Sequence, residues 1–500
     1  MDPVAPWHGT AVPSSGKESQ DSEGDPNLVT WDSPTSQENP RNWSRKRKRA
    51  VVTVVSCYTL LSPLSSSMIA PALPLLSEQF TVTNSAKQSM MLSVFVLAYA
   101  IGPLFLAPLS EMFGRRIVLQ CSNGVFLIFS LVCGFAQSSE QLTAFRFFCG
   151  LGGSAPLAVG GGTISDLFTP DERGTAMSVY SLAPLLGPCI GPIVGGWIVQ
   201  GLHTDNRWRW IFWAVTMFGF CIASIGMVIL PETYQPRILE LKCNRLKKET
   251  GNLKLHTIFQ LQNNEDWKAR FKRNLIRPFV FLATEQVVQL LAIYGSMVYG
   301  CMYLILTTFS EVFVLRYHES VGISSLNYFS LAVGFSLGGQ IGGRLVDRIY
   351  RYFKEQNDGV GQPEFKLPLM MATSCILPVG ILLYGWSAEY AVHWIVPNIG
   401  SALFGFGLMG VFLSIQNYLV DQYSLYAASA LSAAAFLRSL AGFGFPLFAP
   451  AMYKALGYGI GNTILAAVTI VIGIPAPFLL WKFGPWLRAR SNYSPGGKGR

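Results

Sequence analysis

Three ionisable side chains stand inside long apolar stretches, and they are the first candidates for chemistry. Arg146, Glu285 and Arg438 are each flanked by many uncharged residues. A charge in such a position needs a partner, water or a function. Arg146 either extends to the nearer membrane surface or points into a polar cavity. Glu285 and Arg438 either neutralise each other, or Glu285 binds and releases a proton, and all three residues are candidates for proton coupling.

Two short charged turns, at 107–116 and 343–351, follow comparable apolar runs in the two halves of the chain. An acidic residue followed by arginines in both turns is the trace of an internal repeat. Such clusters either anchor a helix end or act as a gate at one membrane face. Asp166 lies on the same face as the first turn, which predicts an ion pair, and Asp421 occupies the matching place in the second half. The expected cytosolic gate comprises Glu111, Gly114, Arg115, Arg116, Asp166, Asp347, Arg348, Arg351 and Asp421.

The segment 187–196 combines glycines four residues apart with two prolines. Glycines at this spacing share one helix face and let a neighbouring helix approach closely. Each proline removes a backbone donor and bends the helix. The segment is therefore either a kinked packing interface or a helix that bends during a conformational cycle. Its residues are Gly187, Pro188, Gly191, Pro192, Gly195 and Gly196.

Polar and aromatic residues follow Glu285 along the same run. They offer hydrogen bonds and flat apolar surface to a bound molecule, although the same residue types also occur in ordinary packing. The candidates for lining a substrate cavity are Gln286, Gln289, Tyr294, Tyr299 and Tyr303.

The elements that position these residues are expected to be membrane-spanning helices. Half of the 500 residues are hydrophobic and 13% are charged, whereas a soluble domain has about 25% charged residues. Apolar runs long enough to cross a bilayer predict an all-α membrane protein with twelve helices in two six-helix halves. The expected crossings are 50–70, 88–109, 117–137, 142–166, 174–200, 210–230, 279–309, 323–344, 367–387, 391–418, 427–452 and 459–481.

The formal net charge of +10 follows from where the basic residues lie between these crossings. With the N-terminus inside, and with Arg344 at the end of its crossing counted as inner, thirty-one Lys and Arg residues fall on the inner side and five on the outer side. This asymmetry follows the positive-inside rule and argues against a nucleic-acid partner. Both termini are therefore expected to be cytosolic. The expected divisions are a disordered N-terminus at 1–44, a first half at 45–230, a cytosolic linker at 231–277, a second half at 278–482 and a tail at 483–500.

Several motifs resemble those of one transporter family, the major facilitator superfamily. The turn at 107–116 resembles the loop motif between its second and third spans. Arg146, with Gly150 and Gly153, is similar to its fourth-span motif, in which the arginine is implicated in proton coupling. The segment 187–196 is similar to the fifth-span motif of its antiporters. The resemblance implies two repeated halves that rock around a site near the bilayer midplane.

Other features resemble the fungal drug:proton antiporters with twelve spans. They are the sequences at 39–43, 208–210 and 231–234, and Glu285, which matches a glutamate of the seventh span. Gln286 departs from that pattern because a proline usually follows the glutamate. Together these features cover roughly residues 39–485 and say little about the substrate.

The resemblance implies a secondary active transporter: a proton-coupled exporter of small amphipathic organic molecules, such as a drug, toxin or fungal secondary metabolite. The alternatives are an importer or facilitator of a polar metabolite or organic acid, and a membrane sensor that no longer transports. No nucleophile–base pair, phosphate loop or metal cluster stands out, so we expect no enzyme, cofactor or metal site. The expected form is a monomer in the plasma membrane, with a small-molecule substrate, protons and the lipid bilayer as partners.

Overall fold

The computed structural model describes residues 27–494 except 170–171, 203, 205, 263–266, 424–425 and 492. Within this part of the chain, ten stretches are long and apolar enough to cross a membrane. The last, Ala427–Arg490, has 64 residues and would, as one helix, be about three times as long as a bilayer core is thick. It reverses at Gly457, whose φ is 75°, and therefore holds two crossings. With α8 (Arg173–Gly201), the chain has the twelve expected crossings.

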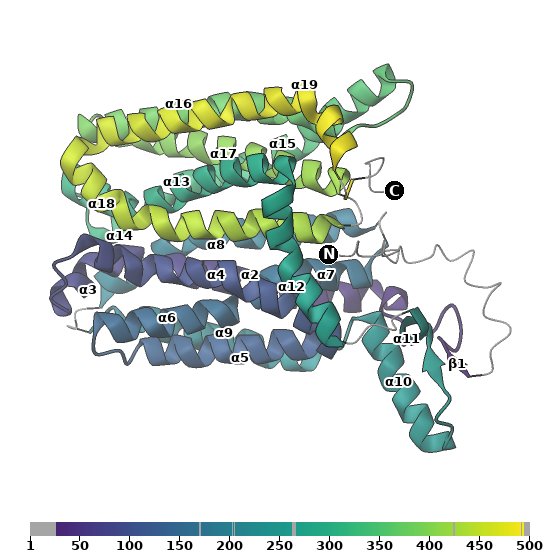
Figure 1. Ribbon diagram of the computed structural model, residues 1–500. Helices are drawn as coiled ribbons and strands as arrows, with labels where there is room; N and C mark the ends of the chain where they lie inside the picture. The colour runs from purple at the N-terminus through teal and green to yellow at the C-terminus, as the bar shows by residue number, and fades with distance from the viewer. Residues whose placement is uncertain are drawn as a thin grey trace.

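The first half is a bundle of helices that lie side by side, drawn in purple and blue in Figure 1. In lipid, the helix is the element that satisfies every backbone donor and acceptor within the segment itself. The elements of this half are α2 (Arg45–Ser67), η2 (Ala70–Ala72), α3 (Leu73–Gln79), α4 (Ser85–Phe113), α5 (Arg115–Cys133), α6 (Ser139–Gly153), α7 (Ala155–Leu167), α8 and α9 (Arg209–Ile229).

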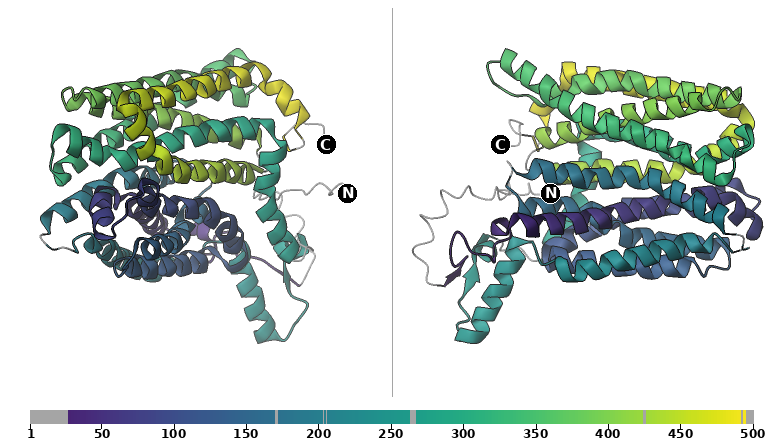
Figure 2. Two further views of the ribbon diagram at one scale, coloured as in Figure 1. Left: turned by 60° about the vertical axis from the view of Figure 1, so that its left-hand side comes forward. Right: turned by 180° about the vertical axis from the view of Figure 1, so that it is seen from behind.

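The second half stacks on the first with its helices in a similar direction (Figures 1 and 2). Its α18 packs along α4 of the first half. The elements are α13 (Gln286–Tyr317), α14 (Val321–Leu326), α15 (Tyr328–Gln356), η3 (Pro363–Lys366), α16 (Leu367–Glu389), α17 (Ile395–Gln422), α18 (Ala427–Gly473) and α19 (Pro475–Arg490).

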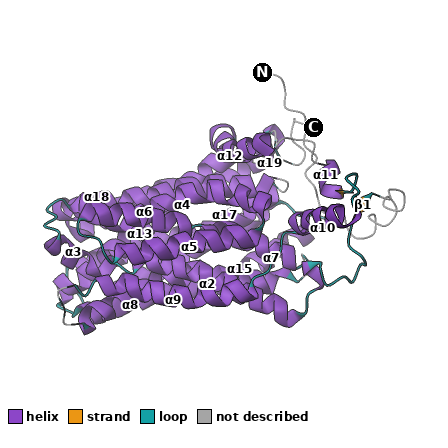
Figure 3. Ribbon diagram, turned by 90° about the horizontal axis from the view of Figure 1, so that it is seen from below, coloured by secondary structure: helices purple, strands orange, loops and turns teal. Residues whose placement is uncertain are grey.

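The linker between the halves gathers at one end of the bundle, where β1 (Leu28–Val29) and the end of α19 also lie (Figures 1 and 3). We call this the linker end, and the opposite end, near α3 and α14, the far end. The linker contains α10 (Gln235–Thr250), β2 (His256–Thr257), α11 (Ile258–Gln262) and α12 (Trp267–Thr284).

Residues 28–44 have a defined structure, although they fall in the range expected to be disordered. β1 (Leu28–Val29) pairs in parallel with β2 of the linker, and η1 (Pro40–Asn42) precedes α2. The Lys242 ammonium lies 2.7 Å from Asp32 and 3.0 Å from Glu38, and Trp43 is buried. Partial burial lowers the pKa of the Lys242 amine, but the hydrogen bonds to these two carboxylates outweigh it and the pKa is raised. The first 26 residues lie outside the described part of the chain.

The seventh crossing begins at Gln286, later than the expected position near 279. Residues 267–284 instead form α12, which runs steeply across the direction of the bundle helices at the linker end (Figure 1). The sequence at the end of α12 is apolar because one face of this helix packs on the bundle. Phe281 on that face is fully buried and contacts Tyr423. Apolar composition alone did not separate this surface helix from the crossing that follows.

Candidate functional site

The turn between α4 and α5 brings charged residues of several helix ends together at the linker end of the first half. We call this cluster, centred on Arg115 and Asp166, the joint. Gly114 has a φ of 98°, so α4 ends there and the chain turns at once into α5. The Arg115 guanidinium lies 3.3 Å from a carboxylate oxygen of Asp166 at the end of α7. It also donates a 2.6 Å hydrogen bond to the Ser110 hydroxyl. The structure therefore contains the ion pair predicted between this turn and Asp166.

Glu232, which follows α9, completes the joint and was not among the candidates from sequence. Its carboxylate accepts hydrogen bonds from the backbone N–H groups of Arg115 at 2.9 Å and Arg116 at 3.1 Å. It accepts two more from the N–H groups of Thr233 and Tyr234. The first N–H groups of a helix have no partner within the helix, and a negative charge there is favoured by the helix dipole. The Pro-Glu-Thr-Tyr sequence was the signal that could have found it.

The acidic–basic turn of the second half does not form such a joint. α15 continues to Gln356, more than three turns beyond Gly343. Asp347 and Arg348 therefore stand on an exposed helix surface. Arg351 donates a 3.4 Å hydrogen bond to the backbone carbonyl of Asp347, one turn earlier in the same helix.

Asp421 has a partner other than the arginines of that turn. Its carboxylate lies 2.7 Å from the ammonium of Lys366, at the end of η3. A second ion pair, 3.1 Å long, joins the Arg488 guanidinium to Glu364. Asp166 and Asp421 thus occupy matching positions in the two halves, but they pair with different residues: Asp166 with an arginine of the first turn and Asp421 with Lys366.

A cavity of about 740 Å³ opens at the linker end. It lies between α4, α7, linker helices and the start of α18, and Glu111 and Asp166 are on its wall together with Arg273 and Arg277. Apolar residues such as Leu104 line it deeper along α4. The opening of the cavity is therefore lined by acidic and basic side chains, and its deeper wall along α4 is apolar.

The two halves touch at the far end. The Gln200 side-chain oxygen, at the end of α8, accepts a hydrogen bond from the backbone N–H of Gly322 in α14. One turn earlier, Gly196 is so close to Ser325 that any side chain at that glycine would clash. The two halves are therefore in contact at the far end, and a cavity opens at the linker end.

Arg146 is fully buried and does not extend to the membrane surface. One terminal nitrogen of its guanidinium donates to the Ser66 carbonyl at 2.8 Å and to the Leu92 carbonyl at 3.4 Å, and the other to the Ser65 carbonyl at 3.4 Å. The guanidinium also lies 5.2 Å from the centre of the Phe95 ring. Of the two alternatives from sequence, extension to the surface is not observed. The guanidinium points inward, onto these carbonyls and this ring, and it lines neither the linker-end cavity nor the hollow between α5 and α9.

The glycine-rich segment of α8 packs directly on α2. A Cβ atom at Gly187 would lie 2.8 Å from the Pro63 side chain. Gly191 and Gly195 meet the backbone of α2 at Leu64 and Met68 in the same way. This is the close approach that the glycine spacing predicted, and the helix remains continuous through Pro188 and Pro192.

Glu285 lies at the corner between α12 and α13 and not deep inside a crossing. Its backbone is extended, with φ −97° and ψ 102°. The residue is 5% exposed, and its carboxylate accepts a 2.9 Å hydrogen bond from the Tyr423 hydroxyl. The alternative in which Glu285 neutralises Arg438 is not observed, because Arg438 lies far along α18 with two aromatic rings as neighbours.

The five candidates for a substrate cavity occupy different parts of the second half. Gln286 is exposed at the linker end, and the Gln289 amide donates to the Leu282 carbonyl and so ties α12 to α13. The Tyr294 hydroxyl is bonded to Ser374 at 2.7 Å. The other two, Tyr299 and Tyr303, lie in the middle of the bundle, with ring centres 5.1 Å apart.

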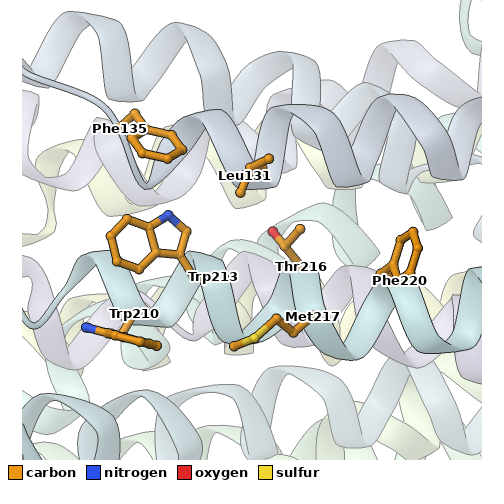
Figure 4. Close-up of a pocket in the computed structure, with 7 residues that line it drawn as sticks. All are labelled: Leu131, Phe135, Trp210, Trp213, Thr216, Met217 and Phe220. Carbon is orange, nitrogen blue, oxygen red and sulfur yellow. The ribbon is translucent and has the colours of Figure 1, made fainter.

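A second hollow, of about 450 Å³, lies on the outside of the first half between α5 and α9. Figure 4 shows Trp210 and Trp213 on α9 and Phe135 at the end of α5, with Leu131 and Met217 nearby. Its exposed lining is almost entirely apolar, as expected for a surface that contacts lipid. It has none of the charged groups that distinguish the linker-end cavity.

Known proteins resemble this chain along almost its whole length. It is 46% identical to "Efflux pump vrtL" of Penicillium aethiopicum, over 97% of this chain and 95% of that protein. It is 40% identical to "Efflux pump radE" of Floropilus chiversii, over 95% of this chain and 87% of that protein. A transporter of Schizosaccharomyces pombe, described as uncharacterized, is 43% identical over 94% of this chain and 95% of that protein.

Solved structures share the fold at low sequence identity. The xylose transporter XylE from E. coli, in a partially occluded inward open conformation, matches 87% of this chain and 99% of its own with a TM-score of 0.63 and 17% identity. A bacterial homologue of the lysosomal transporter Spinster matches 89% of this chain and 98% of its own, with a TM-score of 0.64 and 15% identity. The sequence profile of the Major Facilitator Superfamily matches residues 55–446. This multi-pass membrane protein therefore belongs to the major facilitator superfamily.

Proposed function

We propose that this protein exports small amphipathic organic molecules from the cytosol in exchange for protons, by alternating access. The observation that carries the proposal is the asymmetry between the two ends of the bundle. The halves meet at the far end through Gln200 and Gly322, and a cavity of about 740 Å³ opens at the linker end. A transporter of two rocking halves passes through such a state when it takes up cargo from one side. The similarity to proteins named as efflux pumps supports export.

The linker end is proposed to face the cytosol. The linker gathers there together with β1 and the end of α19. The side of the expected crossings that includes the linker carries most of the basic residues, and the positive-inside rule assigns such a side to the cytosol. An impermeant thiol reagent applied to intact cells would test this orientation. Leu253→Cys in the linker should resist the reagent, whereas Tyr390→Cys at the far end should react, since both side chains are exposed.

Alternating access predicts that the far-end contact must open during every cycle. A short bifunctional thiol reagent that joins Gln200→Cys to Gly322→Cys should hold the protein open at the linker end and stop transport. Reductive cleavage of the linkage should restore transport. The single variant Gln200→Cys, treated in the same way, controls for damage by the reagent, and transport that continues in the cross-linked protein would refute the cycle.

Glu285 is the residue we propose as a proton site. A guanidinium stays protonated in proteins, so Arg146 and Arg438 cannot give up a proton, whereas a carboxyl can. Glu285 is a buried carboxyl beside the Tyr423 hydroxyl, at the corner where the linker enters the second half. Proton uptake there would remove a charge at the point where α12, α13 and α17 meet.

Glu285→Gln keeps the shape of the side chain and removes the titration. In vesicles with an imposed pH gradient, this variant should exchange cargo without concentrating it. Concentrative transport at the normal rate would exclude Glu285 as the proton carrier. The direction of proton-driven flux would also distinguish export from the alternative, an importer or facilitator of a polar metabolite.

A further inference from the structure

Aromatic side chains and one guanidinium meet in the middle of the bundle. The Arg438 guanidinium of α18 lies 4.9 Å from the centre of the Tyr299 ring on α13 and 5.4 Å from that of Phe412 on α17. Tyr299 in turn lies 6.0 Å from Phe412. Arg438 and Tyr299 stand eleven and thirteen residues inside their helices, or about 17–20 Å from the linker-end start of each. Since a bilayer core is about 30 Å thick, this cluster is near its midplane.

The cluster lies where the two halves face each other. A Cβ atom on Gly442, one turn beyond Arg438, would touch both Tyr299 and Val96 of α4 in the first half. Tyr303, one turn along α13 from Tyr299, approaches the Ser66 hydroxyl of α2 to 3.4 Å. A molecule bound at the cluster would therefore contact the surface that rearranges when the halves rock.

Arg438 has no carboxylate partner within the described part of the chain. Its Nε has no hydrogen-bond acceptor, and its neighbours are the two rings. The sequence explains why: α18 contains no Asp or Glu, and neither does α13 between Gln286 and Ser310. Arg146 differs at its two terminal nitrogens, which donate to three backbone carbonyls, although its Nε, like that of Arg438, has no acceptor. The Arg146 guanidinium is thus held by backbone carbonyls, whereas the described residues around Arg438 supply two rings and no acceptor for its Nε.

The lining of the linker-end cavity ends short of Arg438, about one to two helical turns before it on α18. Ser432 and Leu104 are on the cavity wall, and Ser432 is six residues from Arg438 on the same helix, about 9 Å. Arg438, Tyr299 and Phe412 are half-buried, so part of each side chain remains accessible. Cargo entering at the linker end would reach this group after passing the acidic and basic side chains at the opening of the cavity.

We infer that the cargo is an organic anion built on an aromatic ring system, and that Arg438 binds its negative group while Tyr299 and Phe412 pack against its rings. This inference rests on the proposed export function. A guanidinium binds carboxylates and similar oxyanions through two parallel hydrogen bonds, and the low polarity of the site strengthens the attraction. Aromatic faces alone would attract cations, but here the Arg438 guanidinium lies against one side of each ring and would repel a cationic cargo.

Two dyes of one scaffold and opposite charge test the charge preference on the purified full-length protein. Fluorescein is an anion and rhodamine 6G a cation, and both carry a xanthene ring system with a phenyl substituent. Binding is measured by fluorescence polarisation on detergent-solubilised protein, without any transport. The unaltered protein should bind fluorescein at least tenfold more tightly than rhodamine 6G. Equal affinity, or tighter binding of rhodamine 6G, would overturn the inference without any variant being needed.

Variants of Arg438 assign the preference to this residue. Arg438→Gln should weaken fluorescein binding about tenfold or more, and Arg438→Lys should retain part of it. Arg316→Gln is the matched control, since Arg316 also lies over a tyrosine ring, that of Tyr458, but near the far end. An unchanged fluorescein affinity in folded Arg438→Gln would refute the assignment. If fluorescein binding depends on Arg438 but the protein shows no proton-driven transport, the anion site stands. Only the proposal of proton-coupled export is then contradicted.

Discussion

The two halves of the bundle differ most at the linker end, where the sequence repeats an acidic–basic turn. In the first half, the ends of α4, α7 and α9 meet at one point, and Arg115, Asp166 and Glu232 hold them together. In the second half, α15 extends into solvent, and Asp347 and Arg348 are exposed. The same pattern of charges therefore builds a joint in one half and a solvated helix surface in the other.

The backbone explains the difference. Gly114 ends α4 within the motif and brings the next helix start to the charges, so a carboxylate can accept its free N–H groups. The second turn has a glycine at its beginning, Gly343, and there the helix continues. The shared charge motif therefore predicts the same joint only when a glycine that ends the helix stands at the same position of the motif in both halves.

Loss of the Glu232 charge should have the largest effect at the joint. Glu232→Gln keeps one acceptor but removes the charge from four backbone donors and the helix start. It should lower the free energy of unfolding by about 2 kcal/mol and reduce transport severely. Thermal unfolding in detergent and transport in vesicles measure the two effects. Glu240→Gln is the control, since its 2.7 Å ion pair with Arg237 is partly exposed, and an equal loss there would contradict the role of Glu232.

The Arg115–Asp166 pair should show coupling of intermediate size. Each single change to alanine should lower transport while the protein still inserts into the membrane. The double variant should lose less than the sum of the two, with a coupling energy of roughly 0.5–3 kcal/mol for groups in contact. Thermal unfolding of the four proteins measures it, and strict additivity would mean that the ion pair contributes nothing.

The Lys366–Asp421 pair should matter less. It joins η3 to the end of α17, with side chains 15% and 30% exposed, and Asp421 accepts no helix-start N–H group that the structure describes. Lys366→Met and Asp421→Asn should each lower the free energy of unfolding by about 1 kcal/mol or less and leave transport within twofold of normal. A loss as large as that of Glu232→Gln would mean that the second half has a joint of equal importance at this pair.

The sequence predicted the crossings well because a bilayer imposes length and apolarity on each helix. It predicted the Arg115–Asp166 contact because Arg115 begins one helix and Asp166 lies at the end of another, at the same face. It failed for Glu285, because an apolar face of α12 continued the apolar run and hid the corner before α13. It also could not separate Arg146 from Arg438, since only the fold places three carbonyls around one guanidinium and two rings around the other.

The smallest effect is expected at the exposed segment of α15. Asp347→Ala and Arg348→Ala remove charges that water solvates, so each should change the free energy of unfolding by less than about 0.5 kcal/mol and leave transport unchanged. The structure is hollow at the linker end, however, and a joint could form in the second half only when that end closes. Transport rates decide between these cases, since stability reports mainly the state described here. If Arg348→Ala slowed transport as much as Arg115→Ala while leaving thermal unfolding unchanged, the second turn would form its contacts only when the linker end is closed. The two turns would then act in different states of the transport cycle.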